Sequence, residues 1–235
     1  VRAGEVDERM ISFVDFAPTL LSLIEIEPPD YYHGFPFEGI FKSKNERKYI
    51  HAAADRFDEY YDQIRAVRDK RYKYLRNYKP DKPYYLPLEY RQKMNTMQEL
   101  LHLEKEGELN ESQLQWFRKS KPEEELFDTF NDPHELRNLA NDTSLKEKLN
   151  ELKNECDKWI HNTDDKGFMP ETELIEMFWP NKKQPRTKKP LITTYDGMLH
   201  AACETEGPRY FDFMMLNRNR FIRWNAPIQY TNTLT

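Results

Sequence analysis

Four polar side chains that could take part in binding chemistry lie close together in the sequence: His51, Asp55, Arg56 and Asp58. His51 lies within a stretch, residues 48–54, whose pattern predicts a β-strand, and the other three residues follow directly after it. We expect them in a strand-end loop, where Arg56 could make a bidentate contact to a carboxylate or sulfate and Asp55 or Asp58 could accept hydrogen bonds from hydroxyl groups. The alternative is an ion-pair network that only braces the loop.

A basic hairpin is the second chemical candidate. Residues 64–68 and 72–77 are predicted to be antiparallel strands joined by a polar turn at 69–71. Its cationic side chains are Arg65, Arg68, Lys70, Arg71, Lys73 and Arg76. An anionic polysaccharide could lie across them. Strand alternation divides them between two faces, however, and we favour a packed face whose long side chains reach water.

Other chemically suggestive residues have plainer interpretations. Asp164 and Asp165 follow a predicted helix, and we interpret them as solvated carboxylates at the helix end. His134 and Glu135 look like a metal pair, but Glu135 is better explained as part of a capping box begun by Asp132. The two cysteines, Cys156 and Cys203, are too few for a disulfide framework.

The elements that position these residues indicate an α+β fold. Helices are predicted over 88–106, ended by Gly107, over 111–118, and over 144–161, where an apolar stripe is clearest. We expect a small antiparallel sheet, with an edge strand at 125–127, packed by this last long helix. A basic linker and a β-rich appendage after residue 190 complete the prediction.

Near the start of the chain, a further helix is predicted after Asp15. We expect the Asp15 carboxylate to cap the first turn and Pro28 with Pro29 to stop the helix. Its buried stripe is predicted to consist of Leu20, Leu21, Leu23 and Ile24.

Composition excludes some classes of protein. The 235 residues are 38% hydrophobic, 14% aromatic and 33% charged, with a net charge of −5. The aromatic content argues against disorder, and the charge balance argues against a nucleic-acid binder. No apolar run reaches the roughly 20 residues that cross a bilayer. Because the chain starts with Val1, we expect that any export signal lies upstream of it.

Three strings resemble the C-terminal region of the sulfatase family, in the alkaline-phosphatase-like superfamily. They are FVDFAPTLL at 13–21, IRAVRDKRYKY at 64–74, and ELFD at 125–128 leading into NDPHE at 131–135 and NLA at 138–140. Arg56, Asp58 and Glu59 resemble a bacterial branch close to heparan N-sulfatase-like enzymes and arylsulfatases. One departure is Glu25, where family members often have glycine, so this helix is expected to end without a left-handed glycine.

The resemblance implies a hydrolase of sulfate esters or N-sulfates, acting on a sulfated sugar. Its partner would be a missing N-terminal catalytic α/β domain that carries a formylglycine and a calcium ion, and its location would be periplasmic or secreted. The family's nucleophile motif, C/S-x-P-x-R, begins at no Cys or Ser of this sequence. This chain alone is therefore expected to have no catalytic residue, to bind no metal, and to contribute a wall of the substrate cleft.

The resemblance also implies boundaries. Residues 1–28 would end the catalytic domain, 29–180 would form the C-terminal α+β subdomain, 181–190 the basic linker and 191–235 the β-rich tail. Two alternatives stay open: a non-catalytic glycan-binding module, and the C-terminal part of a related phosphatase of the same superfamily. No contact with nucleic acid or membrane is expected.

Overall fold

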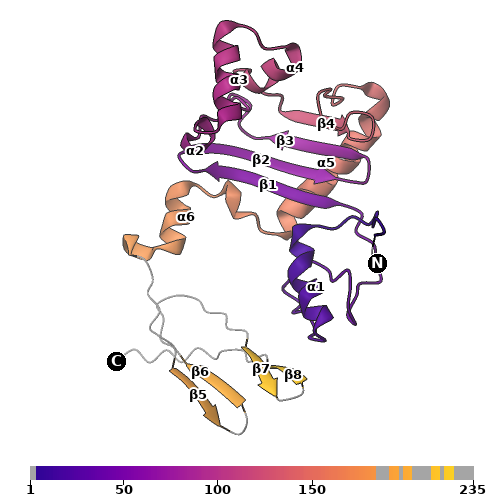
Figure 1. The fold of residues 1–235 in the computed structure, drawn as a ribbon, viewed down its shortest axis with the longest axis vertical. Helices are drawn as coiled ribbons and strands as arrows, with labels where there is room; N and C mark the ends of the chain where they lie inside the picture. The colour runs from indigo at the N-terminus through magenta and orange to yellow at the C-terminus, as the bar shows by residue number, and fades with distance from the viewer. Residues whose placement is uncertain (1–3, 184–190, 196–197, 203–212, 218–219, 225–235) are drawn as a thin grey trace. The chain divides into compact units, whose positions relative to one another are not determined.

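The structure is a computed structural model, and it describes residues 4–183, 191–195, 198–202, 213–217 and 220–224 (Figure 1). The chain forms two compact units. The first unit comprises Val1–Ile11 with Glu46–Gly167, and the second comprises Ser12–Asn45 with Phe168–Thr235. The boundaries implied by the family resemblance stay predictions. No helix in the described part of the chain has the length and apolar character to span a membrane.

The first unit is an antiparallel sheet with one long helix across it (Figure 1). The four strands lie in chain order: β1 (Ile50–Phe57), β2 (Tyr60–Arg68), β3 (Tyr72–Asn77) and β4 (Glu124–Asp128). The helix is α5, Lys146–Asn162. The predicted α+β class, the β2–β3 hairpin and the edge position of β4 are confirmed.

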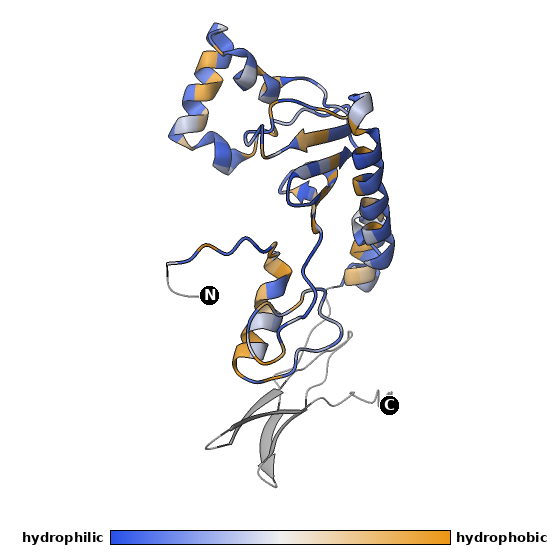
Figure 2. Cartoon of the chain, turned by 90° about the vertical axis from the view of Figure 1, so that its right-hand side faces the viewer, coloured by the Kyte–Doolittle hydropathy of each residue, from blue (hydrophilic) through white to orange (hydrophobic). Residues whose placement is uncertain are grey.

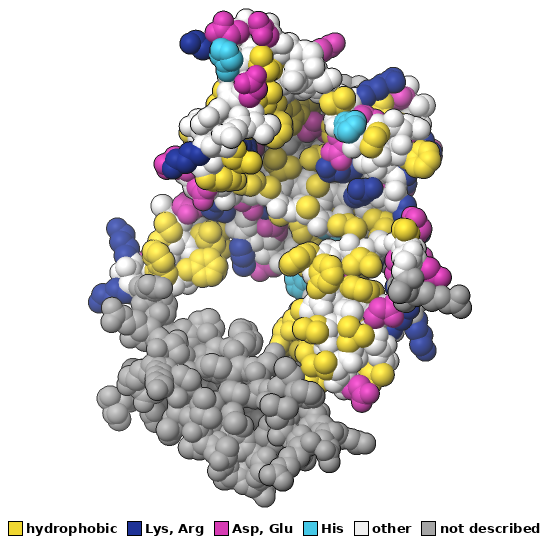
Figure 3. Space-filling model, in the orientation of Figure 1, with side chains coloured by type: hydrophobic (Ala, Val, Ile, Leu, Met, Phe, Trp, Pro, Cys, Tyr) yellow, Lys and Arg dark blue, Asp and Glu magenta, His cyan; other side chains and the backbone are white. Residues whose placement is uncertain are grey.

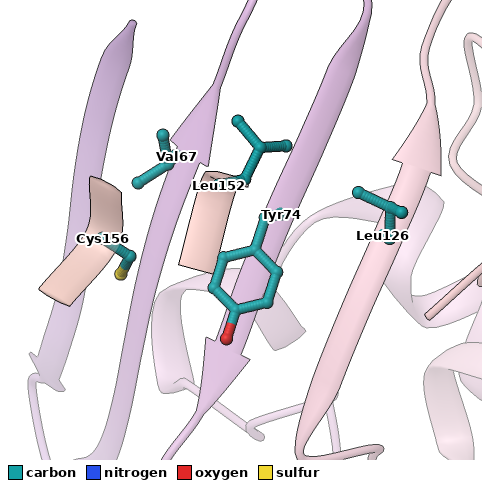
Figure 4. Packing of buried hydrophobic residues seen from close by; sticks show 5 residues of the cluster. All are labelled: Val67, Tyr74, Leu126, Leu152 and Cys156. Atoms are coloured by element: carbon teal, nitrogen blue, oxygen red, sulfur yellow. The ribbon is translucent and has the colours of Figure 1, made fainter. Parts of the chain in front are cut away.

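The core lies between α5 and one face of the sheet. Register places Val67 of β2 opposite Tyr74 of β3, and Tyr74 opposite Leu126 of β4, so the three side chains share a face. Leu152 and Cys156 of α5 pack on them, and all five are fully buried (Figure 4). Burying such side chains supplies about 2 kcal/mol each, which makes this cluster the main source of stability in the unit.

A helical excursion connects β3 to β4. It contains α2 (Glu89–Gln92), α3 (Asn95–Glu106), α4 (Glu111–Leu114) and a 3₁₀ turn, η2 (Gln115–Phe117). The single helix predicted over 88–106 is therefore two helices, with a break before Asn95. Gly107 ends α3 at φ 74°, as predicted, because glycine adopts a left-handed backbone without strain. The excursion returns to its starting point, since the Asn77 amide donates to the Glu123 carbonyl (2.8 Å).

The segment between β4 and α5 is a series of turns, so the predicted helix start at Asp132 is wrong. Glu135 has a left-handed backbone, φ 56°, which is incompatible with continuing a helix. Its carboxylate accepts from Lys73 Nζ (2.6 Å) instead of capping Asp132. The Asp132 carboxylate accepts from the Arg137 amide (2.8 Å). A salt bridge to β3 therefore replaces the expected capping box.

In the second unit, α1 (Phe16–Leu23) follows a 3₁₀ turn, η1 (Phe13–Asp15), and its polar side is the covered one. Asp15, Thr19 and Ser22 are buried. Their side-chain oxygens accept the backbone amides of Phe35 (2.8 Å), Phe37 (3.0 Å) and Phe41 (2.9 Å) in that order. Positions 15, 19 and 22 share one helix stripe, so loop 34–41 is fastened along this side.

One prediction for α1 is thus wrong, and another holds only in part. Asp15 does not cap the helix; its carboxylate accepts the Ser12 amide (2.8 Å) and the loop amide. The predicted stripe is buried only in part, since Leu21 and Ile24 are half-buried whereas Leu20 is 62% and Leu23 58% exposed. Figures 2 and 3 show this apolar side of the helix. The helix ends without a left-handed glycine, as expected, because Glu25 itself takes φ 62° and the Ile26 amide closes the turn on the Leu21 carbonyl (2.8 Å).

The described residues in the rest of the second unit form a helix, a 3₁₀ turn and two strand pairs. Helix α6 covers Glu171–Phe178, and η5 covers Pro180–Lys182. Strands β5 (Leu191–Tyr195) and β6 (Met198–Ala202) form one antiparallel pair, and β7 (Phe213–Asn217) and β8 (Arg220–Trp224) form another. Strands were predicted in this tail. Residues 184–190 of the predicted linker, and Cys203, lie outside the described residues.

Candidate functional site

The four candidate residues lie on a strand and its turn. His51, Asp55 and Arg56 belong to β1, and Asp58 opens the two-residue turn to β2 with φ 47°. The expected strand-end loop is therefore wrong for three of them, because β1 continues to Phe57 and pairs there with Tyr60. The register shifts between Ala54 and Arg56, where Asp55 lies opposite two residues of β2, Asp62 and Gln63, so the extra residue of this bulge belongs to β2.

His51 packs on α5. Its Nε2 lies 3.1 Å from Oε1 of Glu155, and its ring stacks on Trp159 with centroids 5.1 Å apart. Burial lowers the pKa of His51, and the bond to Glu155 opposes this only in part. These contacts fix the start of β1 on the long helix.

Asp55 and Asp165 hold one buried arginine between them. The Arg65 side chain is fully buried; its Nη1 lies 2.7 Å from Asp55 Oδ1 and its Nε 2.5 Å from Asp165 Oδ2. Burial alone would lower the pKa of Arg65, but the bonds to Asp165 and Asp55 raise it above its usual value, so the guanidinium stays charged. The interpretation of Asp165 as a solvated carboxylate is therefore wrong, whereas the Asp164 side chain is 83% exposed.

Arg56 and Asp58 lie at the β1–β2 end of the sheet, where cations surround one aromatic ring. The Tyr61 ring centroid lies 5.4 Å from Cζ of Arg56, 5.6 Å from Nζ of Lys79 and 6.0 Å from Nζ of Lys82. Such an arrangement suits an anionic sugar, which offers negative groups and C–H faces. The signal for Lys79 and Lys82 was the lysine- and proline-rich string after β3, which was not singled out. The substrate-binding role of the four candidates stays a prediction.

Most cations of the basic hairpin have carboxylate partners. Besides Arg65, Arg76 Nη1 lies 2.5 Å from Asp157 Oδ1, and Arg71 Nη2 lies 2.6 Å from Asp128 Oδ2. Lys73 bonds to Glu135, as described above. The geometry supports the packed-face interpretation for these residues.

The described residues do not fit the catalytic groups that the resemblance implies. No cluster of three or more His, Cys, Asp or Glu residues among them could hold a metal ion. Cys156 is enclosed in the core, where burial raises the pKa of its thiol to about 11. A thiol so placed is neither accessible nor ionised near neutral pH. We therefore derive no bond-breaking step from this part of the chain.

Comparisons with known proteins find similarity to sulfatases. A protein of Formosa agariphila described as an ulvan-active sulfatase is 54% identical over 208 residues, which are 88% of this chain and 35% of that protein. Another ulvan-active sulfatase of the same organism is 27% identical over 157 residues, or 63% of this chain and 29% of that protein. No protein-family model matches the chain.

Solved structures of sulfatases also resemble part of the chain. A 2-O GAG sulfatase is 24% identical, with a TM-score of 0.43, over 65% of this chain and 25% of its own. A sulfatase of Bacteroides fragilis is 21% identical, with a TM-score of 0.43, over 68% of this chain and 27% of its own.

The expected resemblance to a sulfatase is thus confirmed by sequence. The chain resembles the C-terminal region of such a protein, and it spans about a third of the length of the curated relatives that it matches.

Proposed function

We propose that this chain is part of a sulfatase that removes sulfate from a polysaccharide, with ulvan as the first substrate to test. The observation that supports this is the 54% identity to an ulvan-active sulfatase along 88% of the chain. The same identity weighs against the related phosphatase as an alternative. A non-catalytic glycan-binding module remains the second candidate, supported by the cations around Tyr61.

In this proposal the bond-breaking groups, a formylglycine and a calcium ion, belong to residues outside this sequence. The chain contributes shape, stability and contacts to substrate. The apolar side of α1 supports such a division, because Phe13, Phe16, Leu20 and Leu23 are all more than half exposed. Exposed apolar surfaces of this kind are typical of interaction sites. We propose that the rest of the enzyme covers them.

The proposed substrate contacts are made from the β1–β2 end. Arg56 binds a sulfate or carboxylate of the sugar, and Asp58 accepts from its hydroxyl groups. His51 and Asp55 act on the same strand by holding it against α5 and Arg65. Since a polysaccharide does not enter cells, we propose that the enzyme acts in the periplasm or outside the cell.

The test uses the intact protein that carries this sequence. Sulfate release from ulvan is measured before and after removal of calcium, together with an Arg56→Ala variant and an Arg68→Ala control, an exposed arginine on the neighbouring strand. We expect calcium-dependent release, with KM raised about tenfold by Arg56→Ala, which corresponds to about 1.4 kcal/mol of lost binding, and unchanged by the control. Absence of sulfate release from any sulfated polysaccharide would refute the proposed function.

A further inference from the structure

A charged hollow lies at the end of the sheet opposite to the β1–β2 turn. It has a volume of about 490 Å³, within the range of sites for small molecules. Its lining comes entirely from the first unit: Met10, Glu46, Arg47, Lys48, Asp69, Lys70, Arg71, Tyr72 and Lys148. We propose that this hollow is a second subsite that binds a sulfate- or carboxylate-bearing sugar unit of an anionic polysaccharide. The proposal rests on the proposed function for the identity of the polymer.

The acidic group of the β2–β3 turn, Asp69, is occupied in building the wall of the hollow. The Asp69 carboxylate accepts the amides of Arg71 (2.8 Å) and Tyr72 (2.6 Å) and also Lys148 Nζ (3.0 Å). Burial would raise the pKa of Asp69, but these bonds lower it below the usual value. Asp69 therefore stays ionised and holds both the turn and Lys148 in place, rather than repelling a ligand as a free carboxylate would.

Arg71 is fixed in a similar way. Its Nε and Nη2 contact the Asp128 carboxylate at 3.0 and 2.6 Å, and its carbonyl accepts the Thr129 amide (2.9 Å). The guanidinium lies over the Tyr72 ring, 5.0 Å from its centroid. The wall is thus a preformed surface of charged and aromatic groups. Its side chains therefore lose little further conformational entropy when a ligand binds.

Two lysines remain available to an incoming anion. Lys70 is exposed, and no hydrogen bond or ion pair joins it to another residue in the described part of the chain. The Lys48 side chain is 72% exposed; its Nζ lies 3.3 Å from Glu151 Oε1 and 4.9 Å from the centroid of the Tyr49 ring. The lining has more cationic than acidic side chains, but Asp128 and Glu151, which pair with Arg71 and Lys48, leave only a small excess of positive charge. Recognition of an anion therefore depends on where the ammonium groups of Lys48 and Lys70 lie. A sulfate between them would accept charge-assisted hydrogen bonds.

The hollow is far from the contacts proposed above. At about 3.3 Å per residue, the ten steps along the chain from Lys48 to Asp58 span roughly 30 Å. A single sugar unit cannot reach both ends, whereas a polymer can. Engaging two units of one chain raises the overall affinity for polymer above that for a short fragment.

Lysine labelling of the intact protein tests the proposal directly. The protein is acetylated under limiting reagent, alone and with sulfated ulvan oligosaccharides, and modified positions are read by mass spectrometry. We expect Lys48 and Lys70 to be protected severalfold and Lys105, an exposed lysine on α3, to be unaffected. Unchanged labelling at Lys48 and Lys70 under saturating oligosaccharide would overturn the proposal.

Two further ligands identify what is recognised. Chemically desulfated oligosaccharide is expected to give no protection, and inorganic sulfate at the same concentration only weak protection. Equal protection by inorganic sulfate would refute a sugar subsite and leave a site for the free anion. Protection by the desulfated sugar would refute recognition of the charge.

Charge reversal supplies an independent measurement. Lys70→Glu and Lys48→Glu are each expected to weaken oligosaccharide binding about tenfold, while Lys105→Glu, with the same change in net charge, leaves it unaltered. Equal weakening by all three variants would mean that only overall charge matters, and would overturn the proposal. Because labelling and binding need no turnover, they remain interpretable if no sulfate release is found.

Discussion

Arg65 of β2 and Asp165, one hundred positions further along the chain, are joined by two contacts, Nε to Oδ2 at 2.5 Å and Nη2 to Oδ1 at 3.0 Å. Asp55 of β1 holds the other side of the same guanidinium. The backbone after Asp165 is also held in place, since the Gly167 amide donates to Asp165 Oδ1 and the Gly167 carbonyl accepts from the Gln63 side chain. One buried cation therefore ties two strands to the segment that follows α5.

Removing this cation should be costly. Arg65→Met leaves two partly buried carboxylates without a partner, and we expect the free energy of unfolding to fall by about 3–5 kcal/mol. Arg68→Met on the same strand, where the side chain is exposed, should change it by less than about 0.5 kcal/mol. Urea unfolding of both variants measures the difference. Equal effects would mean that Arg65 contributes nothing through its ion pairs.

Gly167 should tolerate no side chain. A Cβ at this position would lie 2.1 Å from Arg65 Nη2 and 2.5 Å from Asp55 Oδ2, too close for either atom. We expect Gly167→Ala to destabilise the protein by roughly 1–3 kcal/mol. In the Arg65→Met background the nearest obstacle is gone, so the same substitution should cost less. A thermal melt of the single and double variants shows this coupling, and purely additive effects would contradict it.

The Cys156 thiol should react slowly. Its pKa is about 11 in the folded protein, against 9.0 for an ordinary thiol, so its thiolate is about a hundredfold rarer near neutral pH. Alkylation at pH 8, followed at this residue by mass spectrometry, should be at least that much slower than in urea. As the pH rises, the folded protein also retains the thiol proton of Cys156 to a higher pH than the unfolded chain does. Its contribution to stability is therefore complete below pH 9 and lost as the pH rises from 9 to 11.

His51 should make stability depend on pH in the opposite direction. Because burial lowers its pKa below the usual 6.5, the unfolded chain binds the proton more readily than the folded protein. Stability from this residue is complete above pH 6.5 and declines as the pH falls below that value. His51→Phe keeps a ring on Trp159 but cannot titrate, and should flatten the curve between about pH 5 and 7. An identical slope in both proteins, measured by urea unfolding, would contradict the assignment.

Substitutions on the apolar side of α1 should have opposite effects in the isolated chain and in the intact protein. Leu20→Lys with Leu23→Lys removes exposed apolar surface, so the 235-residue chain alone should aggregate less. In the intact protein the same pair should lower the melting temperature by several degrees, because two charges would be buried. Light scattering and thermal melts provide the comparison. No loss of stability in the intact protein would argue that nothing covers this face.

The sequence was informative where a pattern is local. The stripe of α5, the glycine that ends α3 and the alternation of the β2–β3 hairpin each depend on neighbours within a turn or a strand pair, and each was predicted. The strands on both sides of Asp58 were predicted too short, because a two-residue turn of Asp and Glu lacks the glycine or asparagine typical of tight hairpins.

The errors come from contacts that no local pattern encodes. The period of α1 showed which side is apolar but not which side is covered, and loop 34–41 covers the polar one. Asp165 looked like a helix-end carboxylate because its partner is a hundred residues away. The hollow near Lys70 was missed for the same reason, since Met10, Lys48 and Lys148 meet only in the folded chain.

The excursion between β3 and β4 begins and ends at adjacent points of the sheet, where Asn77 meets Glu123. Both ends of this segment are bonded to the sheet: Tyr84 donates to Glu125 (2.5 Å), and the buried Lys121 ammonium pairs with Asp62. Helices α2, α3 and α4 lie between these two bonded ends. Evolution can therefore lengthen, trim or exchange them without disturbing strand pairing, because closing a longer loop adds little entropic penalty. This stretch is therefore a suitable place to insert a new module by engineering.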